Sequence, residues 1–280
     1  MVKHLFSVIA FIVCSTSLMG QPKGNLFIIG GGTRTPQLMQ AMLATAQLKK
    51  EDYIIVLPMA SAETDTAVYY FKRSMVDICS NPIVNFNFIK GEKPAKTRLD
   101  SLQKAKLIFI AGGDQSRFMQ VVLNTPVYEA IHKAYANGAT IAGTSAGAAV
   151  MSRYMITGRE LLGDTTYQST YRKVWQKNIE FDEGLGLLDS VIIDQHFIVR
   201  SRYNRLLSAL AAFPSYPCIG IDESTAIIVN GSNVSVTGYS QVILFTKPED
   251  LKITGEGLIK FSDIKMQLFT PGDKFELNYK

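Results

Sequence analysis

The sequence predicts an α/β fold with a mostly parallel sheet flanked by helices and a β-rich C-terminal part. From residue 25, short apolar runs alternate with amphipathic segments of helical spacing, which is the order of βαβ units. Several of these runs are apolar throughout, as expected for parallel strands that are buried on both faces. After residue 225, closely spaced strand patterns are separated by turns, which predicts a hairpin or a meander.

The first half of the chain supplies the predicted elements in order. Each apolar run is followed by a segment whose apolar residues recur at helical spacing. We expect strands at residues 26–29, 53–57, 83–89, 107–111 and 140–142, and helices at residues 36–50, 66–79, 116–123 and 127–137. Gly138 follows the last helix as a C-cap, and the strand after it leads directly into a tight turn at residues 143–147.

The C-terminal part has strand patterns at residues 226–229, 234–237 and 242–245, with an Asn230-Gly231 turn after the first. The sequence has no internal repeat, no low-complexity tract and no long linker. We therefore expect one domain over residues 21–280, with an α/β core at about 24–229 and a β-rich extension at about 230–280.

The composition excludes several classes of protein. The chain has 280 residues, of which 47% are hydrophobic and 19% charged, so it is long and apolar enough to bury a large core. The net charge of +5 is modest, and no run of Lys and Arg interleaved with aromatic residues indicates a nucleic-acid surface. Cys79 and Cys218 lie outside any CxxC or CxxH spacing, so the sequence predicts neither a metal site nor a disulfide framework.

Residues 1–20 have the pattern of a secretory signal peptide. Lys3 and His4 precede an apolar run at residues 5–13, which gives way to small and polar residues through Gly20. A membrane span needs about 20 apolar residues, so this run is too short to be one. We expect a secreted or periplasmic protein without a membrane anchor after cleavage. The alternative is that this run forms a buried first strand or helix.

The clearest chemical motif is Gly-Thr-Ser-Ala-Gly at residues 143–147. It follows an apolar strand and precedes a helix-like segment, which is the setting of a nucleophile elbow. The turn brings flanking backbone segments close together, so the two glycine positions cannot hold side chains. It also places the Ser145 hydroxyl at a helix N-terminus, where free N–H groups stabilise an oxyanion. Ser145 is therefore the predicted nucleophile.

A serine nucleophile needs a base, and the sequence contains three histidines. His4 lies in the predicted signal peptide, and His132 lies in a polar helix, where we expect it to face solvent. Elimination leaves His196, which follows an apolar run typical of a parallel strand and so lies at the edge of the sheet where α/β active sites form. The carboxylate that orients the histidine stays open at this point among Glu160, Asp164, Asp194 and Glu223.

Two further stretches add polar groups to the predicted site. The strand at residues 107–111 ends in a second glycine turn, from which Gly113 can donate its N–H to an oxyanion and Gln115 can contact substrate. Arg200, Arg202 and Arg205 follow His196, and a helix beginning near Phe197 places the last two on one face. Guanidinium groups near a catalytic base indicate carboxylate recognition, and the alternative is a solvated basic helix face.

The Gly-Gly-Gly-Thr-Arg stretch at residues 30–34 follows the first strand, as phosphate-binding loops do. It lacks the lysine of a P-loop and the third glycine of a dinucleotide-binding loop. We therefore interpret it as a rim loop of the serine site and not as a nucleotide site.

Taken together, these motifs resemble the cyanophycinase and peptidase E family of serine peptidases, and most closely its cyanophycinase-like members. The resemblance extends from about residue 24 to about residue 229. It depends on the glycine turns at residues 30–32 and 111–115, the serine motif, the Asp-Gln-His-Phe segment with its spaced arginines, and the segment at residues 220–226. It implies a flavodoxin-like fold related to class I glutamine amidotransferases, usually as a homodimer, with no cofactor.

The resemblance also implies a role for each matching residue. It makes Ser145 the nucleophile and His196 the base, with the N–H groups of Gly113 and Ala146 binding the oxyanion. The acidic member of the triad falls on Glu160, fifteen residues after the serine. The implied substrate-binding residues are Gln115, Asp194, Gln195, Arg200, Arg202 and Arg205.

The implied substrate is cyanophycin, a polyaspartate backbone that carries arginine on each β-carboxyl group, and the implied enzyme is an exopeptidase that releases β-aspartyl-arginine dipeptides. Two alternatives remain at the level of the sequence. The chain could instead hydrolyse other aspartyl or acidic peptides, or it could be a non-catalytic binding module of the same fold. The segment at residues 164–182, which contains Trp175, departs from the family pattern and is a candidate lid.

Overall fold

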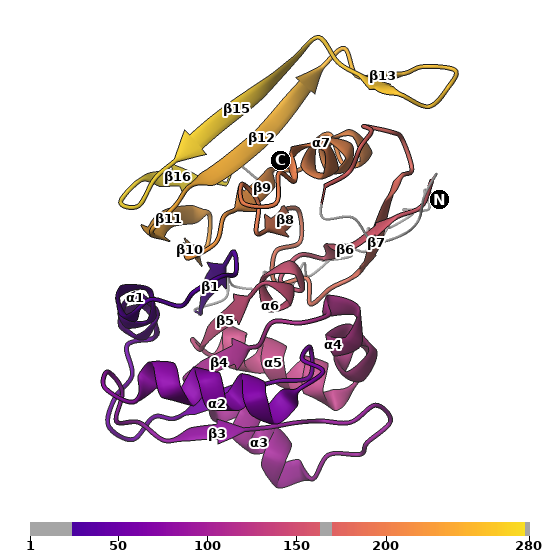
Figure 1. Cartoon of the computed structure of the whole chain (residues 1–280). Helices are drawn as coiled ribbons and strands as arrows, with labels where there is room; N and C mark the ends of the chain where they lie inside the picture. The colour runs from indigo at the N-terminus through magenta and orange to yellow at the C-terminus, as the bar shows by residue number, and fades with distance from the viewer. Residues whose placement is uncertain (1–23, 163–169, 278–280) are drawn as a thin grey trace, which may run out of the picture.

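The structure is a computed structural model that describes residues 24–162 and 170–277 (Figure 1). The expected signal peptide and the candidate carboxylate Asp164 lie outside the described residues. Within the described part, no helix has both the length and the apolar character needed to cross a membrane.

A mostly parallel sheet forms the centre of the molecule, as predicted. Its eight strands have the order β16-β11-β10-β1-β5-β4-β2-β3. The five parallel strands are β1 (Asn25–Ile29), β2 (Ile54–Leu57), β3 (Ile83–Asn85), β4 (Leu107–Ile110) and β5 (Thr140–Thr144). The strands β2, β4 and β5 are buried along their whole length, which explains the continuously apolar sequences of β2 and β4.

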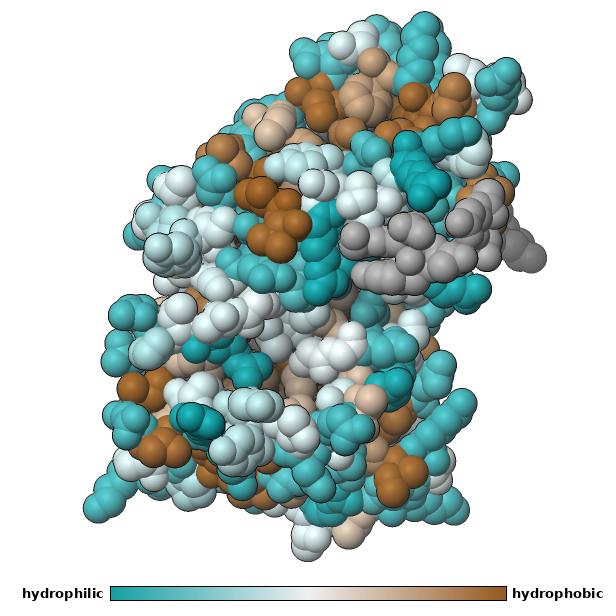
Figure 2. Space-filling model, in the orientation of Figure 1, coloured by the Kyte–Doolittle hydropathy of each residue, from teal (hydrophilic) through white to brown (hydrophobic). Residues whose placement is uncertain are grey.

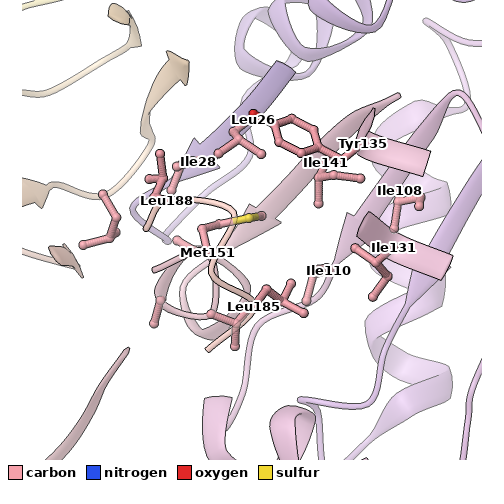
Figure 3. Close-up of a cluster of buried hydrophobic side chains, with 14 of the residues drawn as sticks. Leu26, Ile28, Ile108, Ile110, Ile131, Tyr135, Ile141, Met151, Leu185 and Leu188 are labelled. Carbon is pink, nitrogen blue, oxygen red and sulfur yellow. The ribbon is translucent and has the colours of Figure 1, made fainter. Parts of the chain in front are cut away.

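Helices cover both faces of this sheet. One face carries α1 (Pro36–Ala46) and α2 (Thr64–Met75), and the other carries α3 (Lys96–Lys104), α4 (Gln115–Val122) and α5 (Pro126–Ala136). The strand β1 shows the division, because Leu26 and Ile28 pack with α5 while Phe27 and Ile29 pack with α1. Figure 3 shows the first of these cores, where Leu26 and Ile141 lie beside Tyr135 of α5 and Ile28 lies beside Leu188.

The helix boundaries follow the local capping chemistry. Thr125 accepts a hydrogen bond from the N–H of Val127 at the start of α5, and Pro126 occupies the first turn, where its missing N–H costs nothing. The helix α1 ends at Ala46 and not near residue 50 as predicted, because Gln47 adopts the left-handed conformation that terminates it. The helix α3 was not expected from the sequence.

The β-rich C-terminal part is present and extends the central sheet. The strand β10 (Thr225–Asn230) pairs antiparallel to β1, β11 (Asn233–Gly238) follows it through the expected turn, and β16 (Lys274–Glu276) completes the edge. A second sheet has the order β15-β12-β9-β8, with the bounds Asp263–Phe269, Val242–Glu249, Cys218–Ile221 and Ile192–Gln195. A tip of β13 (Lys252–Ile253) and β14 (Ile259–Lys260) joins β12 to β15.

The hairpin of β12 and β15 lies at one end of the molecule in the view of Figure 1, and apolar side chains gather over it in Figure 2. Met266 is 52% exposed and Leu268 is 50% exposed on β15, which is an edge strand of the second sheet.

The remaining elements connect the two sheets. The strands β6 (Tyr154–Glu160) and β7 (Ile179–Glu183) form an antiparallel hairpin. The segment predicted as a lid, residues 164–182, includes most of β7. The short helix α6 (Ala146–Ala149) follows β5, and α7 (Tyr203–Ala212) packs on the second sheet. The expectation that a helix begins near Phe197 is wrong, since turns occupy residues 197–202 and α7 begins at Tyr203.

Candidate active site

Ser145 occupies the sharp turn between β5 and α6, as the motif predicts. Its backbone has φ 54° and ψ −111°, a conformation that non-glycine residues rarely adopt and that is typical of functional sites. A Cβ atom at Gly143 would lie 2.1 Å from the carbonyl oxygen of Gly147, and one at Gly147 would lie 2.3 Å from that of Ile110. Both glycines of the motif are therefore required by close backbone packing.

Ser145, His196 and Glu223 form a continuous chain of hydrogen bonds. Nε2 of His196 lies 2.8 Å from Oγ of Ser145, and Nδ1 lies 2.5 Å from Oε1 of Glu223. A carboxylate only accepts hydrogen bonds, so Nδ1 carries a proton and Nε2 is free to accept the serine proton. This arrangement is that of a serine, a general base and an orienting acid.

The acidic partner of His196 is Glu223. The assignment of Glu160 to this role, which the family resemblance implied, is therefore wrong. Glu160 lies at the end of β6, where Oε1 accepts a hydrogen bond of 3.5 Å from the side chain of Asn178. Glu223 reaches the histidine because β8 and β9 are parallel neighbours that pair Gln195 with Ile221. The two strands therefore end at the same edge of the sheet, where His196, after β8, contacts Glu223, after β9.

The loop after β1 holds the three members of this chain in place. The carbonyl oxygens of Ile29 and Gly30 accept hydrogen bonds from the N–H groups of Ser145 at 3.1 Å and His196 at 2.7 Å. The carbonyl oxygen of Gly31 accepts one from Ser224, next to Glu223, at 2.8 Å. The loop at residues 30–34, predicted to be a rim of the site, is thus the support that brings the second sheet to the elbow.

Gly31 also explains why this loop is rich in glycine. Its φ is +108°, and a Cβ atom there would lie 2.3 to 2.8 Å from three ring atoms of His196. The imidazole therefore packs directly on the bare backbone of Gly31. A side chain at this position would push the ring away from Ser145 and Glu223.

The surroundings of His196 favour its neutral form. Burial lowers the pKa of His196 below its ordinary value of 6.5, the hydrogen bond to Glu223 opposes this, and the positive charge of Arg200 lowers the pKa further. The imidazole is therefore a base that is deprotonated at neutral pH. It can accept a proton from Ser145 without first losing one to water.

Two backbone N–H groups beside Ser145 are available to an oxyanion. Gly113 lies at the turn between β4 and α4 with φ +138°, and Ala146 is the first residue of α6. Within the described residues, neither N–H donates a hydrogen bond to a protein acceptor. Both amides therefore lack a protein acceptor in the described part of the chain, which the prediction of an oxyanion site at these two positions requires.

A cavity of about 470 Å³ opens beside Ser145. Its lining includes Gly113 and five of the six residues expected to bind substrate, namely Gln115, Gln195, Arg200, Arg202 and Arg205. Three carboxylates also line it, from Asp114, Glu180 and Asp182, of which the last two belong to β7. The arginine set was expected, whereas the acidic side of the cavity was missed, because Glu180 and Asp182 lie in the segment at residues 164–182 that departs from the family pattern.

The sixth expected residue, Asp194, is buried beneath the cavity. Nε of Arg205 donates to its Oδ2 at 2.8 Å, and a second nitrogen of Arg205 contacts Oδ1, which makes a bidentate ion pair. Arg202 donates to both oxygens of Gln195 at 2.6 Å. The prediction that Asp194 contacts substrate is therefore wrong for this structure, and its position shows that it holds Arg205 in place.

Two other residues with reactive side chains, His132 and Cys218, are packed within the fold. Nε2 of His132 lies 2.7 Å from the carbonyl oxygen of Leu185, and its ring packs on Tyr128, so it is half-buried and not solvated as expected. Cys218 is buried, and burial raises the pKa of its thiol. In the part of the chain that the structure describes, no group of three His, Cys, Asp or Glu side chains is placed to hold a metal ion.

Gln115 is also fixed by the fold. Its side-chain nitrogen donates to the carbonyl oxygens of Ile156 and Thr157, each at 2.8 Å. These bonds join α4 to β6 across the cavity. The amide therefore helps to shape the cavity wall.

Comparison with known proteins agrees with this geometry. Residues 26–237 match Peptidase family S51. The cyanophycinase of Nostoc sp. is 31% identical over 267 residues, which cover 91% of this chain and 86% of that protein. The cyanophycinase of Geminocystis herdmanii is 33% identical over 194 residues, which cover 67% of each chain.

Solved structures of peptidases share the fold. A peptidase from an acI-B1 Actinobacterium superposes with a TM-score of 0.67 at 22% identity, over 92% of this chain and 98% of that chain. A putative peptidase E protein from Listeria monocytogenes EGD-e gives a TM-score of 0.54 at 17% identity, over 78% and 99%. The family match spans most of the chain, so this chain belongs to peptidase family S51 and is a serine-type peptidase.

Proposed function

We propose that this chain is a secreted cyanophycinase that cuts cyanophycin through an acyl-enzyme and releases β-aspartyl-arginine dipeptides. The observation that carries the proposal is the hydrogen-bonded chain of Ser145, His196 and Glu223, which opens on a cavity lined by both arginines and carboxylates. The curated relatives that match most of the chain are cyanophycinases, which supports the substrate.

The reaction uses each group in a defined order. The Ser145 hydroxyl attacks the carbonyl carbon of an aspartyl peptide bond as Nε2 of His196 takes its proton. The N–H groups of Gly113 and Ala146 stabilise the oxyanion, and Glu223 stabilises the imidazolium. His196 then gives the proton to the departing nitrogen, the C–N bond breaks, and an ester to Ser145 remains. Water adds to this ester with His196 again as base, which frees the acid and restores the serine hydroxyl.

The charges in the cavity suit the arginine arm of cyanophycin. The arginine is joined through its α-amino group to the aspartyl β-carboxyl, so the arm ends in a guanidinium and a free carboxylate. Arg200 lines the cavity and can bind that carboxylate, whereas Asp182 lies on β7 with its carboxylate exposed. Among the described residues, Asp182 forms no ion pair, and its one hydrogen bond comes from Ser116 at 3.4 Å. It is thus available to a substrate guanidinium.

Secretion and dimer formation belong to the same proposal. The pattern of residues 1–20 supports export, and the family resemblance supports a homodimer. Sequencing the N-terminus of the exported protein tests the first, and sedimentation equilibrium of the mature chain tests the second. A mature protein that keeps residues 1–20, or a monomer at micromolar concentration, contradicts the respective part.

One experiment tests the central claim. The mature protein is incubated with insoluble cyanophycin, and the soluble products are identified by mass spectrometry, with Ser145→Ala as the inactive control. We expect β-aspartyl-arginine from the native protein and none from the variant. Faster cleavage of short α-aspartyl peptides than of cyanophycin would instead assign the chain to other acidic peptides.

A further inference from the structure

A second cavity, of about 620 Å³, also opens at Ser145. Both cavities include Ser145 in their lining, but they divide the rest of the catalytic groups between them. The first is lined by Gly113 and not by His196, and the second is lined by His196 and not by Gly113. Among the described residues, Ser145 is the one that lines both cavities.

The second cavity differs from the first in charge. Its lining contains two arginines, Arg34 from the loop after β1 and Arg73 from α2, and no carboxylate among the described residues. Tyr70 and Ser74 of α2 add hydroxyl groups. The two guanidinium groups can only donate hydrogen bonds, and the two hydroxyl groups can donate as well as accept. This part of the wall therefore suits an anion.

Arg34 has the surroundings of an anion-binding residue. It is half-buried, with its guanidinium carbon 5.8 Å from the ring centre of Phe109. Because the surrounding protein has replaced part of its water, burial lowers the pKa of Arg34 below its ordinary value. Within the described chain neither Arg34 nor Arg73 forms an ion pair. A partly desolvated cation without a counter-ion gains most from a ligand carboxylate.

The path of the proton during the reaction indicates which part of the substrate lies in the second cavity. In serine peptidases the histidine must pass its proton to the departing nitrogen, so the leaving group lies on the histidine side. His196 faces the second cavity, whereas the amide of Gly113, which holds the acyl oxygen, faces the first. The acyl portion therefore belongs to the first cavity and the leaving group to the second.

We infer that the second cavity is the leaving-group subsite, in which Arg34 and Arg73 bind the free carboxylates of the released aspartyl unit. This inference rests on the proposed peptidase function. A leaving unit with a free α-carboxylate is the carboxyl end of a chain, so the two arginines give a physical basis for the exopeptidase activity that the family resemblance implies. A β-aspartyl-arginine leaving group carries two carboxylates, one for each arginine.

Two matched substrates test the subsite. Both are short aspartyl peptides with the same scissile bond, and the leaving residue ends in a free carboxylate in one and in a carboxamide in the other. We expect the native protein to prefer the free acid roughly tenfold or more in kcat/KM, the effect of one or two charged hydrogen bonds. Arg73→Gln and Arg34→Gln lose most of that preference, by slowing the acid and leaving the amide unchanged.

Lys72→Gln is the matched control, because Lys72 is the neighbour of Arg73 on α2 but does not line the cavity. Lys72→Gln also removes one positive charge, and we expect it to keep the preference for the free acid. Arg73 is exposed, so Arg73→Gln tests the subsite without destabilising the fold. Arg34→Lys keeps the positive charge, so it retains part of the preference for the free acid. All variants react with a serine-directed phosphonate at the native rate, since that probe has no leaving-group carboxylate.

The outcomes separate this inference from the proposed function. Equal cleavage of acid and amide by the native protein, or an unchanged preference in Arg73→Gln and Arg34→Gln, overturns the subsite while Ser145-dependent hydrolysis stands. No hydrolysis of either peptide, or activity that survives Ser145→Ala, overturns the peptidase mechanism and the subsite with it.

Discussion

Nδ1 of His196 donates a hydrogen bond of 2.5 Å to Glu223, and this contact joins the ends of two parallel strands that lie side by side in the second sheet. The bond leaves the other ring nitrogen, Nε2, directed at Ser145. Because the serine belongs to the central sheet and the other two residues to the second sheet, the triad depends on how the two sheets meet. The carbonyl groups at the end of β1 make that connection.

Glu223→Gln should lower kcat by about 10³-fold or more, while Glu160→Gln should change it only a few-fold. An amide in place of Glu223 no longer favours the tautomer with a proton on Nδ1, and similar changes in serine proteases cost about 10⁴-fold. Steady-state kinetics of both variants on an aspartyl peptide provide the measurement. If Glu160→Gln were the more damaging change, the assignment of Glu223 would be wrong.

Gly31→Ala should abolish most of the activity, whereas Gly91→Ala should leave it intact. Both glycines have positive φ, +108° and +79°, so both substitutions strain the backbone. Only at Gly31 would the new Cβ meet the His196 ring, since nothing lies within 4 Å of that position at Gly91. Rates of phosphonate labelling at Ser145, measured beside thermal unfolding, separate a displaced histidine from a general loss of stability.

Arg205→Met should destabilise the protein by about 3–5 kcal/mol, because the buried Asp194 carboxylate loses its bidentate partner and keeps only the longer ion pair with Arg202 at 3.6 Å. Arg153→Met breaks an ion pair with Asp189 whose side chains are 55% and 65% exposed, and it should not move the unfolding midpoint measurably. Urea unfolding followed by circular dichroism compares the two. Equal midpoints in both variants would show that the buried pair adds no stability.

The dependence of kcat/KM on pH should have an acidic limb centred below pH 6.5. The reacting base is the neutral imidazole, which exists above the pKa of His196, so the rate falls as the pH drops through that pKa. Burial first, and then the charge of Arg200, lower this pKa. Arg200→Gln should therefore move the limb to higher pH, and Lys72→Gln should not. A limb that moves to lower pH in Arg200→Gln would contradict this account.

Asp182→Asn should raise KM for cyanophycin roughly three- to tenfold and leave KM for a polyaspartate peptide without arginine unchanged, since only the first substrate offers a guanidinium. Glu183→Gln removes the same charge one residue further along β7, where the side chain does not line the cavity, and serves as the control. Initial rates over a range of substrate concentration decide the matter. Equal effects on both substrates would mean that Asp182 does not bind the arginine arm.

Much of this site could be predicted from local sequence. Ser145 is marked by glycines that the turn requires, and His196 was reached by elimination among three histidines. Glu223 had been one of four open carboxylates, and the resemblance favoured Glu160 by its spacing from the serine. The signal that could have found Glu223 was its place just after the buried strand at residues 218–221, parallel to the strand before His196.

The arginines show the limit of reading charges from the sequence. Arg200, Arg202 and Arg205 had equal claims as substrate-binding residues. In the fold, Arg205 is bound to Asp194, Arg202 is bound to Gln195, and Arg200 keeps the most exposure. Burial and partner choice depend on which helix and strand pack together, and neither quantity is encoded in the spacing of three residues.

Residue pattern alone therefore predicted the α/β class, the parallel strands and the C-terminal hairpin, and it singled out Ser145 and His196, whose side chains the fold brings within hydrogen-bond distance. These features follow from periodicity, turn chemistry and steric demands that act within a few residues. The acidic member of the triad, the pairing of Asp194 with Arg205 and the division of the site into two cavities emerged only in the folded chain. They arise where separate elements meet, such as β8 with α7 or β8 with β9, and strand register and sheet packing, which no local pattern reports, determine those meetings.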